Sequence, residues 1–492
     1  MKKHYLFCLL FGMLWLPCAS AFAQPAVRPL RLQEVIALAQ EQSTVAKQAL
    51  TSRETSYWQW RSFKSDYKPQ LSLEGVLPDF SRSITPVTQP DGTLEFQPVS
   101  NNNAELGLTL SQAIGPTGGS IFVTSLMQRF DDFDRNQTRY NGNPAIIGLQ
   151  QPLFAYNKLA WARKIEPLKY EESQRKYLEE REKIAVDATK LYFDLLLAQV
   201  NKGIAAKNLA NNDTLYQIAQ EKYKLGRLSK NDLLQLRLAV LNADLALAQA
   251  TLDAQTASLA LKTYVGIEDK VQLELDVPQT IPATVVVPET ALAEARRNRK
   301  ESINFQRRRL EAESDVARAK GDNGLNANLY ATFGLTNRGA NWTDIYNRPD
   351  NQQVVRMGFT LPVLDWGRQR SIYKAAELQQ QLVQYTLSQE EANFEQQVLT
   401  QVNQYNTLRA RIQTTAEADD IAQQRYEIAK NTFVIGRISI TDLNIALAEK
   451  DQARRAYIAA LSEFWTAYFN LRQLTLFDFE NQTALVNKTE GE

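Results

Sequence analysis

Histidine and cysteine are almost absent from this sequence. Its 492 residues include one histidine, His4, and two cysteines, Cys8 and Cys18, and all three lie within the first 23 residues. The rest of the chain therefore offers no imidazole base, no thiolate nucleophile, no Cys or His zinc ligand and no disulfide. Enzyme chemistry would have to rest on carboxylates, hydroxyls or lysines.

The first 23 residues have the pattern of a secretory signal peptide. Two lysines precede an apolar run from Tyr5 to Leu16, and residues 21–23 (Ala-Phe-Ala) form an A-x-A cleavage site. Because Pro17 directly precedes Cys18, lipid attachment at that cysteine is disfavoured. We therefore expect an unlipidated chain that leaves the cytoplasm.

Neither an excess of charge nor a long apolar helix marks the mature chain. Removing the two lysines of the signal from the 56 basic residues leaves 54, against 55 acidic ones, so nothing indicates nucleic-acid binding. No uninterrupted apolar run beyond the signal reaches about 18 residues, so a transmembrane helix is not expected. A secreted chain can still cross a bilayer as a closed β-barrel, whose strands alternate apolar and polar residues.

The sequence repeats one plan twice. Gly148 matches Gly358, and the turn sequence at 223–233 (YKLGRLSKNDL) matches 433–443 (FVIGRISITDL), both at an offset of 210 residues. An unchanged offset means that neither copy has gained or lost a residue in between, as expected of rods packed in register. We therefore divide the chain into a signal peptide (1–23), a first repeat (24–267), a connector (268–288), a second repeat (289–480) and a C-terminal tail (481–492).

Each repeat is expected to contain helices on both sides of a strand region. A first helix is expected at 30–66 and at 289–320. Two long helices follow, at 155–222 and 230–263 and at 366–432 and 441–473. At 1.5 Å per residue the helix 155–222 would extend ~100 Å, which no ordinary globular core needs.

The segments between these helices alternate as strands do. In the second repeat, apolar Val355, Met357 and Phe359 alternate with Arg356 and Gly358, as in a strand with lipid on one side and water on the other. The other apolar positions with this spacing are Leu71, Leu73, Leu106, Leu108, Leu110, Ile121, Val123, Leu329, Ala331, Phe333, Leu335 and Leu361.

Within the long helices, apolar residues spaced by four and three predict packing seams. They are Leu234, Leu238, Leu241, Leu245, Ala248, Leu252, Gln255 and Leu259 in the first repeat, and Tyr457, Leu461, Phe464, Tyr468 and Leu471 in the second. Polar residues on these helices either line a hydrated lumen or face outer solvent, and the sequence leaves both open. They are Asn201, Asn208, Asn212, Gln217, Gln401, Asn403, Gln404 and Asn406.

This pattern resembles the TolC family of outer-membrane factors over nearly the whole mature chain. The most specific signal is an aromatic-x-x-Gly turn followed six residues later by Asp, present at Tyr223, Gly226 and Asp232 and again 210 residues later. The resemblance implies an α+β membrane protein, a homotrimer in which long antiparallel helical hairpins form an α-barrel tunnel through the periplasm. Twelve strands would form a transmembrane β-barrel in outer-membrane lipid, and no cofactor, metal, nucleic acid or enzyme activity is expected.

By that resemblance the two turns dock a periplasmic adaptor (a membrane fusion protein), which joins the channel to an inner-membrane pump for efflux or type I secretion. The candidate contact residues are Gly226, Arg227, Leu228, Ser229, Gly436, Arg437, Ile438 and Ser439. The glycines also fit as left-handed helix ends and the serines as helix caps. Asp232 and Asp442 would form an anionic ring at the periplasmic entrance, or else serve as carboxylates that favour a helix start.

The sequence departs from the family in two respects. Ile445 stands where some members carry a second aspartate, and Phe433 has no hydroxyl for a closing hydrogen bond. The interval from Pro69 to Pro152 spans 83 residues against 37 from Leu325 to Pro362, which leaves 46 extra. We expect these to add a hairpin or an extended loop, so that four strands per chain is a minimum.

Two other classes of protein would explain parts of this pattern. A soluble periplasmic coiled-coil adaptor or structural protein would explain the rods but not the alternating strands in both halves. An enzyme would have only Asp131, Asp132, Asp134 and Asn136 as a compact acidic cluster, and their spacing does not fit a calcium loop. The basic run 307–309 is expected to be an exposed helix face.

Overall fold

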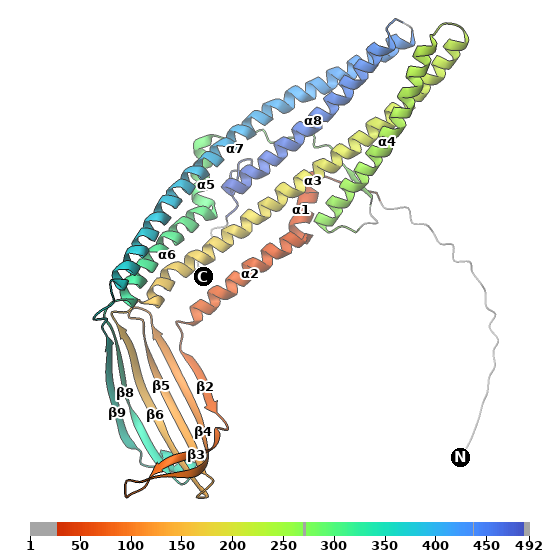
Figure 1. The fold of residues 1–492 in the computed structure, drawn as a ribbon. Helices are drawn as coiled ribbons and strands as arrows, with labels where there is room; N and C mark the ends of the chain where they lie inside the picture. The colour runs from red at the N-terminus through yellow and green to blue at the C-terminus, as the bar shows by residue number, and fades with distance from the viewer. Residues whose placement is uncertain (1–26, 269–271, 436, 487–492) are drawn as a thin grey trace, which may run out of the picture. The chain divides into compact units, whose positions relative to one another are not determined.

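The computed structural model describes residues 27–268, 272–435 and 437–486, so the predicted signal peptide lies outside the described residues. Figure 1 shows the order of the helices and strands. The chain forms two compact units, each assembled from segments that are distant in the sequence. Unit 1 comprises Met1–Ser43, Ala188–Ile281 and Ala418–Ser462, and unit 2 comprises Thr44–Asp187, Pro282–Glu417 and Glu463–Glu492.

The four predicted long helices are confirmed, with ends that differ by no more than about three residues. They are α3 (Lys158–Lys224), α4 (Lys230–Val265), α7 (Arg368–Val434) and α8 (Ile440–Thr475). Both halves of the chain use a helix of 67 residues followed by one of 36. Among the helices of the described residues, none is long and apolar enough to cross a membrane.

The first helix of each half was predicted as one continuous element, and this is wrong. In the first half Ser43, with ψ 149°, separates α1 (Leu32–Gln42) from α2 (Thr44–Ser65). In the second half Arg299, with ψ 151°, separates α5 (Pro288–Asn298) from α6 (Lys300–Asp322).

Ion pairs to a residue that is distant in the sequence stabilise the break at Arg299, so local sequence patterns do not predict it. The Arg299 Nε lies 3.4 Å from the carboxylate of Glu179 in α3, and the Lys300 ammonium lies 2.9 Å from the same carboxylate. Glu179 also accepts a hydrogen bond from the backbone N–H of Lys300 at 3.2 Å. One buried acid therefore fixes the start of α6.

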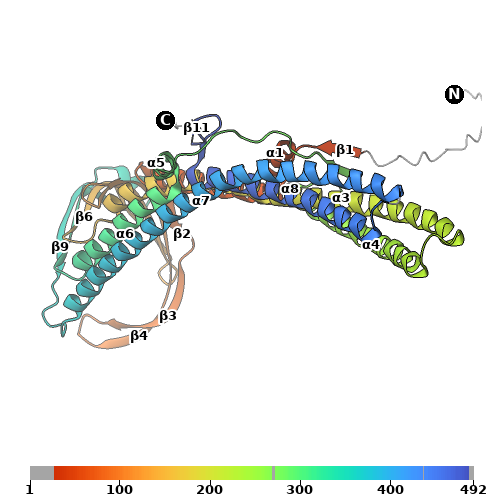
Figure 2. The ribbon, with the colours of Figure 1, turned by 90° about the horizontal axis from the view of Figure 1, so that it is seen from above.

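Unit 2 carries one antiparallel sheet in the order β2-β4-β5-β6-β8-β9, with β3 pairing β4. In Figure 2, β3 and β4 curve away from β6 and β9. The 46 extra residues thus include the expected hairpin, β3 with β4, and further strand as well. The bounds are β2 (Gln70–Val76), β3 (Phe80–Thr88), β4 (Leu94–Ile114), β5 (Gly119–Asp132), β6 (Gln137–Leu153), β8 (Asn326–Gly339) and β9 (Asp350–Thr360), with the 3₁₀ helix η1 (Trp342–Tyr346) between the last two.

One glycine of the sheet is required by a ring packed over it. A Cβ added at Gly148 in β6 would lie 2.1 Å from the ring of Phe122 in β5, which in turn stacks on Tyr330 of β8 at 6.1 Å. At the matching position Gly358, a Cβ would meet nothing within 4 Å.

Smaller strands lie beside the helices. In unit 1, β1 (Val27–Leu30) pairs in parallel with β7 (Gln272–Leu275), and the Tyr192 hydroxyl of α3 donates to the carbonyl of Leu30 at 3.2 Å. In unit 2 the connector reaches α7, where Tyr405 donates to the Thr284 carbonyl at 3.2 Å. The described residues of the connector thus lie beside α3 and α7. A short pair, β10 (Phe477–Asp478) with β11 (Thr483–Ala484), follows α8.

The two predicted helix seams have different outcomes. In α8, Leu461, Phe464, Tyr468 and Leu471 are buried, as predicted, whereas Tyr457 at the start of the seam is half-buried. In α4 the leucines of the predicted seam do not pack within this chain, where they are exposed and a neighbouring face is buried instead. The exposed residues are Leu234, Leu238, Leu241, Leu245, Leu252 and Leu259, and the buried ones are Leu236, Val240, Ala243 and Ala250.

Candidate channel wall and docking site

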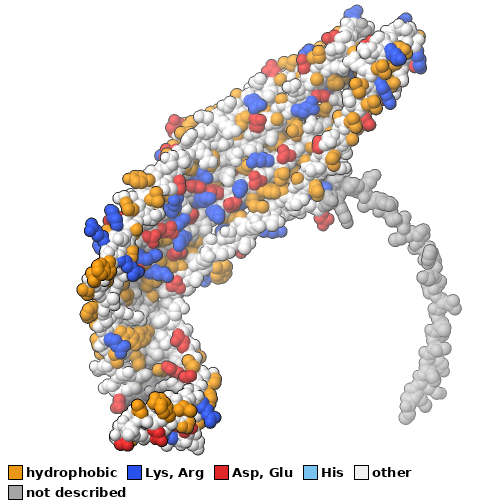
Figure 3. Space-filling model, in the orientation of Figure 1, with side chains coloured by type: hydrophobic (Ala, Val, Ile, Leu, Met, Phe, Trp, Pro, Cys, Tyr) orange, Lys and Arg blue, Asp and Glu red, His pale blue; other side chains and the backbone are white. Residues whose placement is uncertain are grey.

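One face of the sheet in unit 2 is a continuous apolar surface. Leu71 of β2 lies opposite Leu110 of β4, and the same row continues through Val123, Ile147 and Phe333. All five side chains are exposed, Leu71 by 66%. Figure 3 shows hydrophobic side chains over the strand region. Residues 355, 357 and 359 of β9 are 67%, 61% and 73% exposed, so they do not belong to a globular interior.

The opposite face is polar. Ser72 pairs with Thr109, which pairs with Thr124, and the two threonine hydroxyls lie 3.0 Å apart. Farther along the sheet, Arg356 lies opposite Tyr330. A sheet with one apolar and one hydrated face has the pattern of a wall between lipid and water.

The turn between α3 and α4 is a glycine-ended helix terminus. Gly226 has φ +71°, its N–H donates to the Tyr223 carbonyl at 2.9 Å, and the N–H of Arg227 donates to the Lys222 carbonyl at 2.9 Å. Glycine takes this left-handed conformation without the Cβ clash of other residues. The turn is therefore compact and closed by backbone hydrogen bonds.

The turn between α7 and α8 closes in a related way. The predicted site residue Gly436 lies outside the described residues. The N–H of Arg437 donates to the Thr432 carbonyl at 3.1 Å, which matches the bond made by Arg227. The ammonium of Lys222 lies 5.8 Å from the ring centre of Phe433, so the tips of α3 and α7 are neighbours. Phe433 has no hydroxyl group for a hydrogen bond, and it presents the face of its ring to the Lys222 ammonium instead.

Both predicted serines cap the helices that follow the turns. Ser229 Oγ accepts from the N–H of Asp232 at 3.1 Å and donates to its carboxylate at 2.7 Å. Ser439 makes the same two bonds with Asp442 at the same distances. The hydrogen bonds from the Ser439 hydroxyl and backbone lower the pKa of Asp442 from its usual value. In a single chain the two aspartates therefore serve as helix-start carboxylates.

Two apolar side chains at the tips were missed by the sequence analysis. Leu225 and Ile435 each directly precede the turn glycine, and they are 69% and 65% exposed. They stand 210 residues apart, so the repeat itself carried the signal. An exposed apolar residue on each tip beside Arg227 or Arg437 is suited to a protein contact.

Polar bonds join α3 to α7 and α8 within unit 1. Asn208 Nδ2 donates to Asp451 Oδ2 at 2.7 Å, and Asn211 Nδ2 donates to the Tyr426 hydroxyl at 3.1 Å. The Lys450 ammonium lies 3.2 Å from Asp451 Oδ1 and 4.4 Å from the Tyr426 ring centre. We name these five residues the interhelix lock.

Several of the polar residues that were predicted to face either a lumen or outer solvent form hydrogen bonds to neighbouring segments of the chain. Besides Asn208, Asn212 donates to the Ala239 carbonyl at 3.4 Å, and Gln401 donates to the Ala467 carbonyl at 3.3 Å. Asn406 accepts from and donates to the backbone of Val286. These side chains stabilise contacts between segments of one chain.

Other charged residues are also engaged. Asp131 accepts from Asn102, Arg129 and Thr138, and Asp134 accepts from the N–H of Ser100. In the part of the chain that the structure describes, no group of three His, Cys, Asp or Glu is placed to hold a metal.

The expectation of an exposed basic run at 307–309 is wrong for its first two residues. Arg307 is half-buried and lies 2.6 Å from Glu172 of α3, and Arg308 lies 2.5 Å from Glu390 of α7. The partners come from helices more than 80 positions away in the sequence, so local spacing cannot reveal them.

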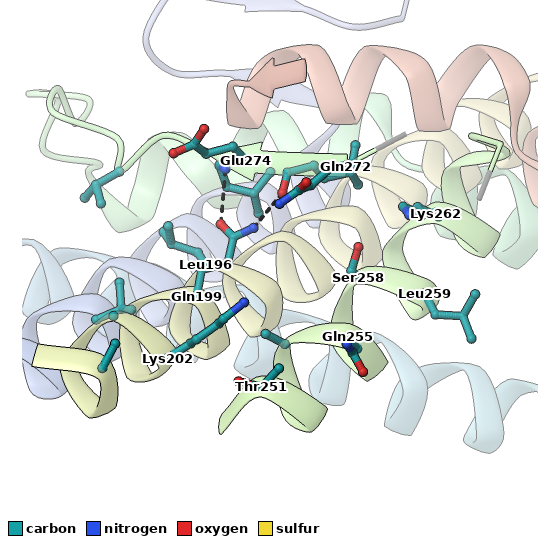
Figure 4. A pocket seen from close by; sticks show the side chains of 17 residues that line it. Leu196, Gln199, Lys202, Thr251, Gln255, Ser258, Leu259, Lys262, Gln272 and Glu274 are labelled. Atoms are coloured by element: carbon teal, nitrogen blue, oxygen red, sulfur yellow. Dashed lines mark hydrogen bonds between the residues drawn. The ribbon is translucent and has the colours of Figure 1, made fainter. Parts of the chain in front are cut away.

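An open groove of about 810 Å³ lies in unit 1 between α3, α4 and β7. Figure 4 shows Gln199 reaching the backbone of β7, where it donates to the Leu273 carbonyl at 2.7 Å and accepts from the N–H of Leu275 at 3.2 Å. Its wall also includes Lys202 and Lys262. The two hydrogen bonds of Gln199 attach β7, which lies in the connector, to α3.

These features agree with comparisons to known proteins. The sequence profile of the outer membrane efflux proteins matches residues 122–267 and 291–475, more than half of the chain. The chain belongs to the outer membrane efflux protein family. It is thus a TolC-family transport channel of the outer membrane and not an enzyme. The alternative of a soluble adaptor is set aside.

Solved structures of outer-membrane channels share the fold of this efflux protein. CmeC of Campylobacter jejuni has a TM-score of 0.65 at 16% identity, covering 90% of this chain and 85% of CmeC. VceC of Vibrio cholerae has a TM-score of 0.63 at 15% identity, covering 90% and 95%. The open-state channel MtrE of Neisseria gonorrhoeae has a TM-score of 0.60 at 14% identity, covering 90% and 88%. No curated protein matches the sequence.

Proposed function

We propose that this efflux protein is the outer-membrane channel of a tripartite efflux or type I secretion system. Three copies surround a water path, with their strands in the outer membrane and their helical hairpins in the periplasm. The substrate passes from an inner-membrane pump and its adaptor to the exterior. The observation that carries this proposal is the sheet with one exposed apolar face, joined in sequence to two pairs of long helices.

The exposed leucines of α4 support assembly with further copies. Leu238 and Leu245 are 58% and 71% exposed and lie on one stripe of the helix. Exposed apolar residues spaced by four and three are typical of a surface that packs against another helix. We assign this stripe to the contact between neighbouring protomers.

The two tips are the proposed adaptor contacts. The contact set is the predicted one, 226–229 and 436–439, extended by Leu225 and Ile435. In the trimer, Asp232 and Asp442 would gather at the periplasmic entrance and favour bound cations, since like charges resist ionising together.

Crosslinking from the tips tests the docking assignment. The mature chain is expected to have no cysteine, so Ser229→Cys and Ser439→Cys each give a single thiol. In intact cells these thiols should capture a periplasmic adaptor. Gln249→Cys, on an exposed part of α4 away from the tip, is the matched control and should not. Failure of both tip cysteines in well-expressed, outer-membrane-inserted protein would refute adaptor docking at the tips.

A further inference from the structure

The sheet has more strands that run its full height than the two hairpins of the family plan require. In the second half α6 leads to β8 and β9 and then to α7. In the first half α2 leads to β2, β3 and β4 before β5 and β6 continue to α3. The family profile begins at residue 122, within β5, so β2 to β4 precede the matched segment. The extra chain therefore forms strands at one edge of the family hairpins.

The added strand β4 spans the sheet instead of forming a loop at its far end. Its pairing with β5 is unbroken from Asn101 opposite Asp132 to Ile114 opposite Gly119. The turn that follows is fixed at the helical end, where Asn157 just before α3 donates to the Gly115 carbonyl at 3.0 Å and to the Pro116 carbonyl at 2.9 Å.

The added strands carry the same apolar surface as the family hairpins. Leu73 of β2 and Leu108 of β4 lie opposite each other and are 67% and 44% exposed, next to the row that runs from Leu71 to Phe333 of β8. On the other face, Glu74 and Thr109 keep the polar character. Strands in an aqueous loop would gain nothing from this alternation, whereas strands against lipid need it.

Two edges of the sheet are left for other copies. Among the described residues, β2 pairs only with β4, and β9 pairs only with β8. β2 leaves the helical end and β9 returns to it, so the two edges are antiparallel to each other. Unpaired backbone groups are not tolerated in a bilayer, so these edges must be closed.

We propose that β2 of one copy pairs with β9 of the next, and that each copy gives six strands to the wall. This rests on the proposed trimer. Three copies with six strands each make eighteen, against the twelve expected from the family resemblance. Because barrel diameter grows roughly linearly with strand number, the exit is about half as wide again as that of a twelve-stranded wall.

A nitroxide scan tests whether β4 faces lipid. Single cysteines at Leu108→Cys and Thr109→Cys are labelled in the full-length protein in lipid bilayers, and their accessibility to oxygen and to a water-soluble nickel chelate is measured. Val355→Cys on β9 gives the lipid-facing reference. The label at 108 should match that at 355, and the label at 109 should be accessible to nickel. Nickel access at 108 equal to that at 109 would overturn the proposal.

Interprotomer crosslinking tests which edges meet. Leu73→Cys in β2 is combined in turn with Val355→Cys, Met357→Cys and Phe359→Cys in β9, and Val123→Cys in β5 replaces it in the matched control series. At least one β2–β9 pair should give covalent oligomers, and no β5–β9 pair should. Crosslinking through β5 alone, or through neither strand in a preparation that is trimeric, overturns the six-strand wall. Absence of any trimer contradicts the proposed function itself.

Discussion

The side-chain amide of Asn208 in α3 donates to the carboxylate of Asp451 in α8 at 2.7 Å. Asp451 is 5% exposed, and it also pairs with Lys450 at 3.2 Å. Lys450 is the neighbour of Asp451 on α8, so only Asn208 joins the buried acid to α3, and separating the two helices would remove one of the two groups that stabilise its charge. The interhelix lock thus links hairpins from the two halves of the chain.

We expect Asp451→Ala to loosen this lock. The substitution leaves the Asn208 amide and the Lys450 ammonium without their carboxylate and should lower the free energy of unfolding by about 3 kcal/mol. Single-channel recordings should show a higher resting conductance. Asp420→Ala is the control, because among the described residues the Asp420 carboxylate accepts a hydrogen bond only from Gln424 of its own helix. A resting conductance equal to that of the wild type would show that the lock does not hold the channel closed.

We expect charge on the α4 stripe to block assembly without unfolding the chain. Leu238→Asp with Leu245→Asp places carboxylates at two exposed positions, so the fold of one copy should survive while the contact between copies is lost. Light scattering of the detergent-solubilised protein should report monomers. Ala246→Asp, at an exposed position of the same helix off the stripe, should remain trimeric. A trimer in the double variant would remove the stripe from the interface.

The buried cluster around Arg472 predicts a pH-dependent stability defect. Its guanidinium lies 3.2 Å from Glu182 and 3.4 Å from Asp478. Burial raises the pKa of Glu182, and the charge of Arg472 opposes that rise. Arg472→Met should therefore raise the pKa of Glu182 further and cost about 3 kcal/mol where the acid is ionised.

The sign of this dependence follows from proton linkage. An acid whose folded pKa lies above its unfolded pKa loses stability as pH rises through that interval. The deficit of Arg472→Met should be larger at pH 8 than at pH 5 when thermal unfolding is followed by circular dichroism. Arg411→Met removes an exposed pair with Glu463 and should cost less than about 1 kcal/mol at both pH values. An equal deficit for Arg472→Met at both pH values would contradict the role of Glu182.

We expect the entrance aspartates to set ion preference. Asp232→Ala and Asp442→Ala should each reduce cation over anion permeability, measured as reversal potential under a salt gradient. Ser439→Ala separates the two roles of Asp442, since it removes the helix cap, at a cost of about 1 kcal/mol, and keeps the charge. It should leave the reversal potential unchanged. An unaltered reversal potential in both aspartate variants would reduce these residues to helix-start carboxylates.

Periodicity along the chain predicted the elements whose determinants are local. The long helices, the serine caps and the alternation of β9 all follow from residues within a few positions of each other. The break at Arg299 did not, because Glu179 that holds it is 120 residues away. The exposed seam of α4 shows a further limit, since spacing identifies a packing stripe without saying whether its partner is in the same chain.

The repeat in the sequence predicted the two helix tips as contact sites. Leu225 and Ile435 were added to them because the structure shows that their side chains are exposed. Gly226 and Ser229 are residue types that favour a helix end and a helix cap, so the sequence can identify them. Leu225 is like any apolar residue near a helix end, and only the structure shows that its side chain is exposed to solvent. Similarly, the 46 extra residues showed alternation in sequence, but only the register between β4 and β5 reveals that they cross the sheet.

Gly148 and Gly358 are identical in sequence and occupy equivalent places in the two halves, yet their freedom to vary is unequal. The Phe122 ring occupies the space above the first, and nothing occupies the space above the second. Two equivalent positions of a repeat can thus both carry glycine although the packing of the chain requires it at only one of them. Within one chain, a larger side chain therefore fits at 358, whereas at 148 it fits only if the Phe122 ring is replaced as well.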